Sequence, residues 1–344
     1  KIIEGLNYPW GLTFIENDNL LITEKNGKLL KVDIKNKEVT QIKHNIQSLQ
    51  FDGGSSQGGL LDVLYHKGYV YFSYSHLHNN NIIHGQDNKY SSTAIARGEL
   101  LENEIKNLEI LLVGTPGLST NKHWGSRLVI KDNLLYASFG ERGKGMIAQD
   151  PTKHPGSIIR INLDGTIPED NPAFVSEPNW LPEVYQIGVR NPQGMTLSPN
   201  DHEIYFSQHG PMGGDNIGIV KYAGNYGWKN IAWGGKEYTW IKIGDEPFKD
   251  EFDKPIIAWV PSMAIGQISF YNGDIFSEWN GDLIGSATKA GLLFRLDFEN
   301  NIIVNEEIIL NQELGRIRDF EIDREGNIFI IIDDEDSSLW KLSK

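Results

Sequence analysis

Short apolar segments recur along the whole chain in a fixed order. The central segment of each unit occurs six times, as NLLITE (19–24), YVYFSY (69–74), LLYASFG (134–140), EIYFSQ (203–208), DLIGSA (282–287) and NIFIIID (327–333). One short apolar segment precedes each copy and another follows it, and their alternation suits strands with one face more exposed than the other. A strand unit that recurs in a fixed order predicts an architecture of repeated sheets.

A fourth apolar segment completes five of these units. It lies at 39–42, 105–113, 183–187, 255–259 and 302–309, and no fourth segment follows the sixth unit. The N-terminal segment KIIEGL (1–6) has no other partner, so we predict that it supplies the missing outer strand. Joining the two ends of the chain in this way closes a ring and removes the exposed edges of an open sheet.

The pattern therefore predicts an all-β fold, a six-bladed β-propeller of four-stranded antiparallel blades that is closed by the N-terminal strand. We expect one domain over residues 1–344, because no Pro-rich hinge or low-complexity tract divides the chain. An open β-sandwich or two smaller sheets is the alternative, since short strands with Gly turns occur in all of these folds. Long polar stretches at 76–92 and 224–253 are predicted to be loops inserted into blades.

Composition narrows the classes of partner. The chain has 32 Lys and Arg against 46 Asp and Glu, a formal net charge of −14, which disfavours nucleic acid or an anionic membrane as a partner of the general surface. The absence of cysteine excludes disulfides, thiolate metal sites and a cysteine nucleophile. No apolar run approaches the roughly 20 residues of a membrane helix, so no membrane insertion is expected. Lys1 in place of Met indicates a processed or trimmed start, and we expect a periplasmic or secreted monomer or homodimer.

Polar residues with complementary chemistry fall at equivalent points of the repeat. In a propeller, the loops that precede each blade's first strand and the turns that join its second and third strands lie on one face. The loops contribute Gln57, His123, Arg190, Asn191, Trp259, Arg316 and Arg318, and the turns contribute Glu141, Arg142, His209, Gly210, Pro211, Lys289, Asp333 and Asp334. A histidine with a carboxylate suits proton transfer, and several cations suit an acidic ligand.

Four cations focused on one axis of a net-acidic chain predict a pocket for a multiply anionic small molecule. They are Lys289, Arg190, Arg316 and Arg318. The alternative is that each one pairs with a nearby carboxylate of the protein. The segment HGPMGGDN (209–216) offers main-chain carbonyls and Asp215 to a hard cation such as calcium.

Ordered motifs along nearly the whole chain resemble the soluble pyrroloquinoline quinone-dependent glucose and aldose sugar dehydrogenases, the glucose/sorbosone dehydrogenase-like family. The motifs are YPWGLTF from Tyr8, SQGGLLDV from Ser56, HWGSRLVI from His123, HPGSIIRINLDGTIPEDNP from His154, VRNPQGM from Val189, QHGPMGGDN from Gln208, NYGWKN from Asn225 and GRIRD from Gly315. Matches that keep their order over the whole length are far more specific than any single motif.

The resemblance implies an enzyme that oxidises the anomeric C1 hydroxyl of aldose sugars to lactones, with pyrroloquinoline quinone (PQQ) and calcium as cofactors. It assigns His123 as the general base, oriented by Glu141, with Gln57 positioning the reacting groups. The cofactor would be held by Arg190, Asn191, Gln193, Lys289, Arg316 and Arg318, with Trp259 as a pocket aromatic, and calcium by the main-chain carbonyls of Gly210 and Pro211 with Asp215 as a further candidate ligand. The resemblance also implies a separate electron acceptor as a partner of the enzyme.

Three positions depart from the pattern of the family. Glu141 stands where an Asp is usual, Val189 replaces a His, and Asn216 replaces an acidic residue, so a second, structural calcium is not expected. Two alternative functions are a calcium-dependent sugar lactonase and a non-catalytic ligand-binding propeller. The cluster of cations argues against the lactonase, which needs carboxylate and Asn ligands around a central metal.

Overall fold

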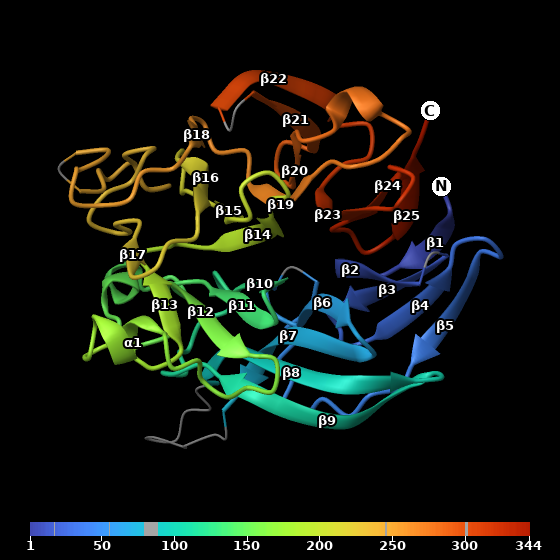
Figure 1. Ribbon diagram of the computed structural model, residues 1–344, viewed down its shortest axis with the longest axis horizontal. Coiled ribbons are helices and arrows are strands. Elements are labelled where there is room, and N and C mark those ends of the chain that lie inside the picture. The colour runs from blue at the N-terminus through green and yellow to red at the C-terminus, as the bar shows by residue number, and fades with distance from the viewer. Residues whose placement is uncertain (17, 55, 79–88, 245, 300–301) are drawn as a thin grey trace.

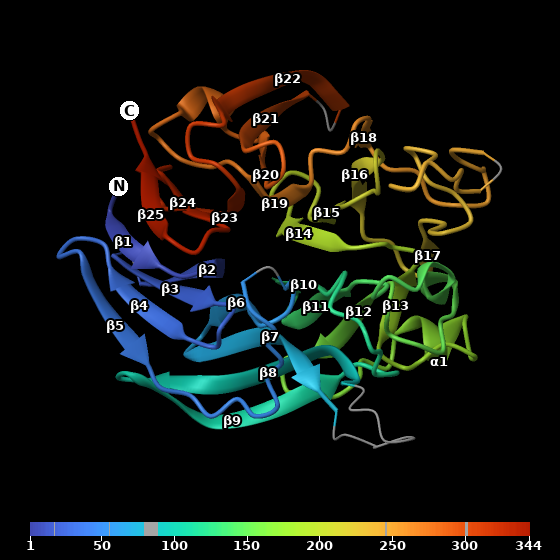
Figure 2. The same ribbon diagram turned by 180° about the vertical axis from the view of Figure 1, so that it is seen from behind.

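The repeated segments form six antiparallel sheets arranged around one axis, as Figure 1 shows for the computed structural model. The structure describes residues 1–16, 18–54, 56–78, 89–244, 246–299 and 302–344. The predicted six-bladed β-propeller is confirmed. The view from behind in Figure 2 shows the same ring, with the first and last strands of the chain side by side.

The strands of each blade run outward from the axis in the order of the chain, except that the N-terminal strand is the outer strand of blade six and blade three adds a fifth strand. The strands are β2 (Pro9–Glu16), β3 (Asn19–Glu24), β4 (Leu29–Asp33) and β5 (Glu38–Ile42) in blade one; β6 (Leu60–His66), β7 (Tyr69–Leu77), β8 (Ser91–Leu101) and β9 (Glu104–Val113) in blade two; β10 (Gly125–Lys131), β11 (Leu134–Phe139), β12 (Ser157–Asn162), β13 (Val184–Ile187) and β17 (Gly224–Asn225) in blade three; β14 (Pro192–Leu197), β15 (Ile204–Gln208), β16 (Asp215–Ile219) and β18 (Ile257–Trp259) in blade four; β19 (Ile265–Phe270), β20 (Leu283–Ala287), β21 (Leu292–Glu299) and β22 (Ile302–Asn311) in blade five; and β23 (Ile317–Ile322), β24 (Ile328–Ile332), β25 (Ser337–Leu342) and β1 (Ile3–Leu6) in blade six.

The N-terminal strand closes the ring as predicted. Strand β1 pairs antiparallel with β25, with Ile3 opposite Leu339 and Leu6 opposite Ser337. Ile3 and Leu6 are buried, whereas Glu4 between them is exposed, so the strand packs only its apolar positions against the core. The edge of blade six is thereby covered within the chain itself.

Blade three has one strand more than the repeat predicted. The two residues of β17 pair in parallel with β13, Gln186 opposite Gly224 and Ile187 opposite Asn225. This pairing begins the inserted segment at 224–253, which therefore leaves from the outer edge of blade three. The other predicted insertion, at 76–92, is bounded by β7 and β8, and its residues 79–88 lie outside the described part of the chain.

The core lies between the blades rather than in one centre. Six clusters of buried apolar side chains each join two neighbouring sheets. Between blades four and five, for example, Tyr205 meets Phe270 edge to face with ring centroids 5.1 Å apart. Sheets that pack face to face around a circle fix the position of each blade end, and hence of the loops that build the site.

Buried ion pairs also link the first strands of three blades at the axis. Arg127 donates from Nη1 to Asp62 Oδ1 and to Asp319 Oδ2, both at 2.9 Å, and all three side chains are buried. Arg127 Nε donates to the main-chain oxygen of Gln193 at 3.1 Å, which brings blade four into the same network.

Across the described part of the chain, no helix is long and apolar enough to cross a membrane.

Candidate active site

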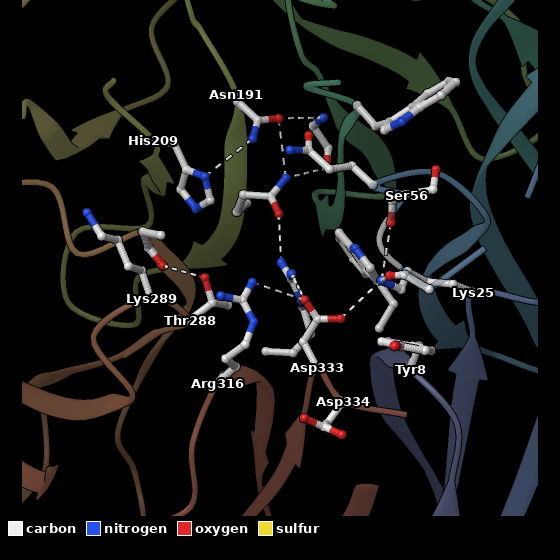
Figure 3. Close-up of a pocket in the computed structure, with 18 of the residues that line it drawn as sticks. Tyr8, Lys25, Ser56, Asn191, His209, Thr288, Lys289, Arg316, Asp333 and Asp334 are labelled. Atoms are coloured by element: carbon white, nitrogen blue, oxygen red, sulfur yellow. Dashed lines mark hydrogen bonds and ion pairs between the residues drawn. The ribbon is translucent and has the colours of Figure 1, made fainter. Parts of the chain in front are cut away.

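One end of the axis opens into a hollow of about 560 Å³. Loops before first strands and turns after second strands of different blades line it, as the repeat predicted. Figure 3 shows side chains from these loops converging on the same space. The lining includes Gln57, Asn191, Gln193, His209, Lys289, Arg316, Arg318, Asp333 and Asp334, together with Tyr8, Trp10, Lys25, Gly54, Ser56, Trp124, Gly125, Tyr238, Ala264 and Thr288.

A network of charges forms one wall of this hollow. Asp333 Oδ2 accepts from Arg318 Nη2 at 2.6 Å, and its Oδ1 lies 3.1 Å from Lys25 Nζ. Burial alone would raise the pKa of Asp333, but Arg318 and Lys25 outweigh it and hold that pKa below its usual range. Arg318 also donates to Gln193 Oε1 at 3.0 Å, so its side chain is fixed before any ligand arrives.

Two further cations stand at the rim. Arg316 is half exposed and lies 3.4 Å from Asp333 Oδ2, and the side chain of Lys289 is exposed beside Thr288 (Figure 3). The hollow thus carries four cations against the carboxylates of Asp333 and Asp334. An anionic ligand therefore meets an excess of positive charge there, although the chain as a whole is acidic.

Amide side chains fix the floor between blades three and four. Asn191 Oδ1 accepts from the N–H of Gly125 at 3.0 Å, and Gln193 Nε2 donates to the carbonyl of Gly125 at 3.1 Å. Asn191 Nδ2 lies 3.5 Å from His209 Nδ1. Both amides are buried, so their orientation is set by the fold.

His123 lies in a second hollow, of about 410 Å³, that adjoins the first. The two share Gln57, His209 and Tyr238 among their lining residues. The main-chain N–H of His123 donates to Gln57 Oε1 at 2.8 Å, and its Nδ1 is hydrogen-bonded to Glu141 Oε1. His123 has a φ of 53°, and a Cβ at Gly140 would lie 2.1 Å from the carbonyl oxygen of His123, so this close approach requires glycine there.

The electrostatics of this dyad favour a neutral imidazole. Burial lowers the pKa of His123 below its usual value and Arg190 lowers it further, while the hydrogen bond with Glu141 opposes them. Burial would raise the pKa of Glu141, but contacts with His123 and the N–H of Gly145 bring it below its usual value. An ionised carboxylate only accepts hydrogen bonds, so Nδ1 carries the proton and Nε2 keeps its lone pair. His123 is therefore arranged to accept a proton.

Arg190 lies buried beneath the second hollow. Its Nη1 donates to the carbonyl of His209 at 3.1 Å, and its guanidinium carbon lies 5.3 Å from the ring centroid of Trp228. Burial lowers its pKa, and Nε has no hydrogen-bond partner among the described residues. A buried cation with an unused donor fits an electron-rich ligand atom in the hollow.

Gly210 and Pro211 line a narrow recess beside both hollows. The turn is held by Asp215, whose Oδ1 accepts from the N–H of Gly210 at 2.7 Å and whose Oδ2 accepts from the N–H of Ile265 at 3.1 Å. The Asp215 carboxylate is buried and engaged with the main chain, so the geometry gives it a structural role. Within the described residues, no group of three or more His, Asp or Glu side chains is arranged to hold a metal ion.

Trp259 is placed apart from the other predicted residues. It ends the outer strand β18, its Nε1 donates to Glu306 Oε1 at 3.0 Å, and its ring meets Phe294. Trp259 is not among the described residues that line either hollow. Both contacts lie on blade five, so the indole packs against that blade.

Sequence reasoning missed several lining residues, among them charged ones from two places. Lys25 occupies in blade one the same turn that holds Lys289 in blade five, so the rule of equivalent positions could have found it. Lys229, Glu237 and Tyr238 come from the inserted segment, where Lys229 Nζ lies 2.5 Å from Glu237 Oε1. No repeat pattern marks residues of an insertion, so only the three-dimensional structure brings them to the site.

Comparison with known proteins identifies the family of the chain. The family model described as Glucose / Sorbosone dehydrogenase matches residues 6–341. The chain is 31% identical to the aldose sugar dehydrogenase YliI of Escherichia coli, over 99% of this chain and 91% of that protein, and 25% identical to quinoprotein glucose dehydrogenase B of Acinetobacter calcoaceticus, over 99% and 86%. The crystal structure of the soluble aldose sugar dehydrogenase of Escherichia coli in the apo form superposes with a TM-score of 0.90 at 29% identity, covering 99% of this chain and 97% of that one. The chain belongs to the glucose/sorbosone dehydrogenase family.

Proposed function

We propose that this protein oxidises the anomeric C1 hydroxyl of aldose sugars to lactones with PQQ as the electron acceptor, and that His123 is the general base. One observation carries the proposal. A neutral histidine, oriented by a carboxylate, lies in a hollow that adjoins a cation-lined hollow. The quinoprotein among its relatives supports PQQ as the cofactor.

The residues present fit a multiply anionic quinone. Lys289 and Arg316 at the rim offer charge to carboxylates, and Arg318 lies behind them. The unused Nε donors of Arg190 and Arg318 are buried polar atoms that a ligand can satisfy. When bound, the quinone supplies the acceptor for the hydride of C1.

Side chains of the protein accept the proton of the sugar and orient the base. The sugar enters the hollow of His123, and its C1 hydroxyl donates a proton to Nε2, the nitrogen that is not engaged by Glu141. The imidazolium that forms is stabilised by the Glu141 carboxylate. Gln57 holds the main chain of His123 and lines both hollows, so it positions the base relative to the cofactor.

Calcium is the second proposed cofactor. The carbonyls of Gly210 and Pro211 would hold it, since hard cations prefer oxygen ligands. Asp215 is engaged with main-chain N–H groups and is not included in this ligand set. A calcium ion at this recess would polarise the quinone as a Lewis acid.

The experiment is a titration of PQQ into the apo-protein with and without calcium, followed by dye reduction with several aldoses. We expect cofactor uptake that depends on calcium and activity that depends on both. His123→Ala should bind PQQ with nearly parental affinity and lose at least about a hundredfold in turnover, the lower range for removal of a general base. Calcium binding without any PQQ uptake would instead favour a lactonase, and uptake without sugar oxidation a binding propeller.

A further inference from the structure

The residue after Glu141 is a buried arginine that contacts the segment leading into His123. Arg142 is 2% exposed. Its Nη1 donates to the carbonyl of Lys122 at 2.7 Å, and its Nη2 donates to the carbonyl of Thr120 and, at 3.1 Å, to Ser91 Oγ. Its main-chain N–H also donates to the carbonyl of His123 at 3.3 Å.

We infer that Arg142 is a positioning residue that fixes the main chain of His123 for proton transfer. Two adjacent residues of one turn then hold the same histidine. Glu141 contacts the imidazole ring of His123, and Arg142 contacts the main chain at His123. The inference rests on the proposed role of His123 as the base. It extends that role to a side chain that lines neither hollow among the described residues.

The local geometry explains why the main chain needs such a clamp. His123 adopts a left-handed conformation, with a φ of 53°, that residues with a side chain rarely take. Such conformations persist when the surroundings over-determine them. Here the N–H of His123 is held by Gln57 from one side, and the carbonyl that precedes it is held by Arg142 from the other.

The acceptors of Arg142 distinguish it from an ordinary buried ion pair. All three hydrogen-bond acceptors of its guanidinium are neutral, two carbonyls and a hydroxyl. The guanidinium lies over the ring of Trp124, the residue that follows His123 and that lines the cation-rich hollow. Burial lowers its pKa to about 9, so it remains protonated at neutral pH. A planar guanidinium that donates to two main-chain carbonyls of one segment, those of Thr120 and Lys122, while it stacks on an indole has a geometry that lysine cannot reproduce.

Arg160 provides a matched control. It is also buried, stacks 4.8 Å from the ring centroid of Tyr185, and donates from Nε to Asn171 Oδ1 at 2.6 Å. It lies on β12, away from both hollows. Unlike Arg142, it also pairs through Nη2 with the exposed carboxylate of Asp170. Arg160→Gln therefore removes a buried, stacked guanidinium together with one ion pair, and it should lower stability without any reason to lower turnover.

Two readouts test the inference, and the first needs no cofactor. In the apo-protein, the Nδ1–H of His123 should give a downfield imidazole proton resonance, identified by its loss in His123→Ala. Arg142→Gln should broaden or abolish this resonance, whereas Arg160→Gln should keep it. In the PQQ-loaded enzyme, Arg142→Gln should lower kcat at least about tenfold with KM for the sugar and Kd for PQQ within about twofold of the parent, because misplacement of a base impairs chemistry more than binding.

Arg142→Lys should give intermediate values of both readouts, and it decides the question if Arg142→Gln does not fold. Parental kcat and a parental resonance in the folded Arg142 variants would overturn the inference, as would an equal loss of kcat in Arg160→Gln. A parent enzyme that fails to oxidise any aldose with PQQ would instead overturn the proposed function. In that case the apo resonance still reports whether Arg142 orders His123.

Discussion

At the scale of single residues, burial divides the four predicted cations into two kinds. Arg190 and Arg318 are buried. Arg190 is oriented by the carbonyl of His209, and Arg318 by the side chains of Asp333 and Gln193. Lys289 and Arg316 are exposed at the rim. The buried pair fixes the shape of the site, while the rim pair is free to adjust to a ligand.

Substitution of the rim cations should weaken PQQ binding without harm to the fold. Lys289→Ala and Arg316→Ala should each raise the Kd for PQQ about 10-fold to 100-fold, since a hydrogen bond to a charged group contributes about 1.5–3 kcal/mol. Equilibrium titration of the apo-protein measures this directly. Arg318→Ala should weaken binding as well, but it also removes one of the cationic partners of buried Asp333 and should lower the melting temperature. Unchanged PQQ affinity in both rim variants would contradict their proposed role.

The pair of His123 and Glu141 predicts a pH profile. A general base works only when neutral, and the pKa of His123 lies below its usual value, so kcat/KM should stay level through neutral pH and fall only on the acid side of that value. This fall is the acid limb of the profile. Glu141 raises the pKa of His123, so Glu141→Gln should move the acid limb to still lower pH. Its plateau should also fall, because the imidazolium loses its counter-charge.

Glu183 offers a matched control for that profile, since its Oε1 lies 2.8 Å from Nε2 of buried His154 in a comparable pair. His154 lines neither hollow among the described residues. Glu183→Gln should therefore leave the acid limb in place. A limb that moves upward in Glu141→Gln would show that the carboxylate does not stabilise the imidazolium.

At the scale of elements, the repeat predicted which strand ends meet but not what inserts between them. The six apolar units placed His123, Arg190, Lys289 and Arg318 at the same end of the ring. The first three lie just before or after an inner strand, and Arg318 is the second residue of β23. Strand β17 escaped this reasoning, since a two-residue parallel strand has no periodicity to detect. Trp259 was expected at the pocket both from its position before blade five and from the resemblance, but it belongs to an outer strand, whose end lies farther from the axis.

The first strands also carry a buried ionic network that should be essential for stability. Arg127→Met leaves the buried carboxylates of Asp62 and Asp319 without their counter-charge, and removal of one partner of such a network costs about 3–5 kcal/mol. Equilibrium urea unfolding should show this loss in the free energy of unfolding. The loss should be smaller at acid pH, where the two carboxyl groups can bind protons.

A surface pair serves as the comparison for this substitution. Lys131 Nζ lies 3.2 Å from Glu203 Oε2, and Glu203 is largely exposed. Lys131→Met should change the free energy of unfolding by no more than about 1 kcal/mol. Equal effects of the two substitutions would mean that the axial network contributes no more than a surface contact.

At the scale of the whole molecule, the ring depends on a strand from the opposite end of the chain. The four main strands of each of blades one to five follow one another along the chain, and only blade three adds a strand, β17, from the insertion in blade four. Blade six, in contrast, needs β1 to cover β25. The cluster of apolar side chains between blades six and one includes Ile3 and Leu6 from that strand. The site lies where all six blades converge, so its geometry depends on this closure.

Leu6→Ala should therefore destabilise the entire propeller rather than loosen one end of the chain. Leu6 is 1% exposed, and truncation of a buried leucine to alanine costs about 2–5 kcal/mol. Glu4 on the same strand is exposed, so Glu4→Ala should change the free energy of unfolding by less than about 0.5 kcal/mol. Urea unfolding monitored by tryptophan fluorescence should move to a lower midpoint in Leu6→Ala with an unchanged slope, because the same surface is exposed in a single transition. If Leu6→Ala unfolded at the midpoint of Glu4→Ala, β1 would be an appendage whose loss the other strands tolerate, and the ring would not depend on it.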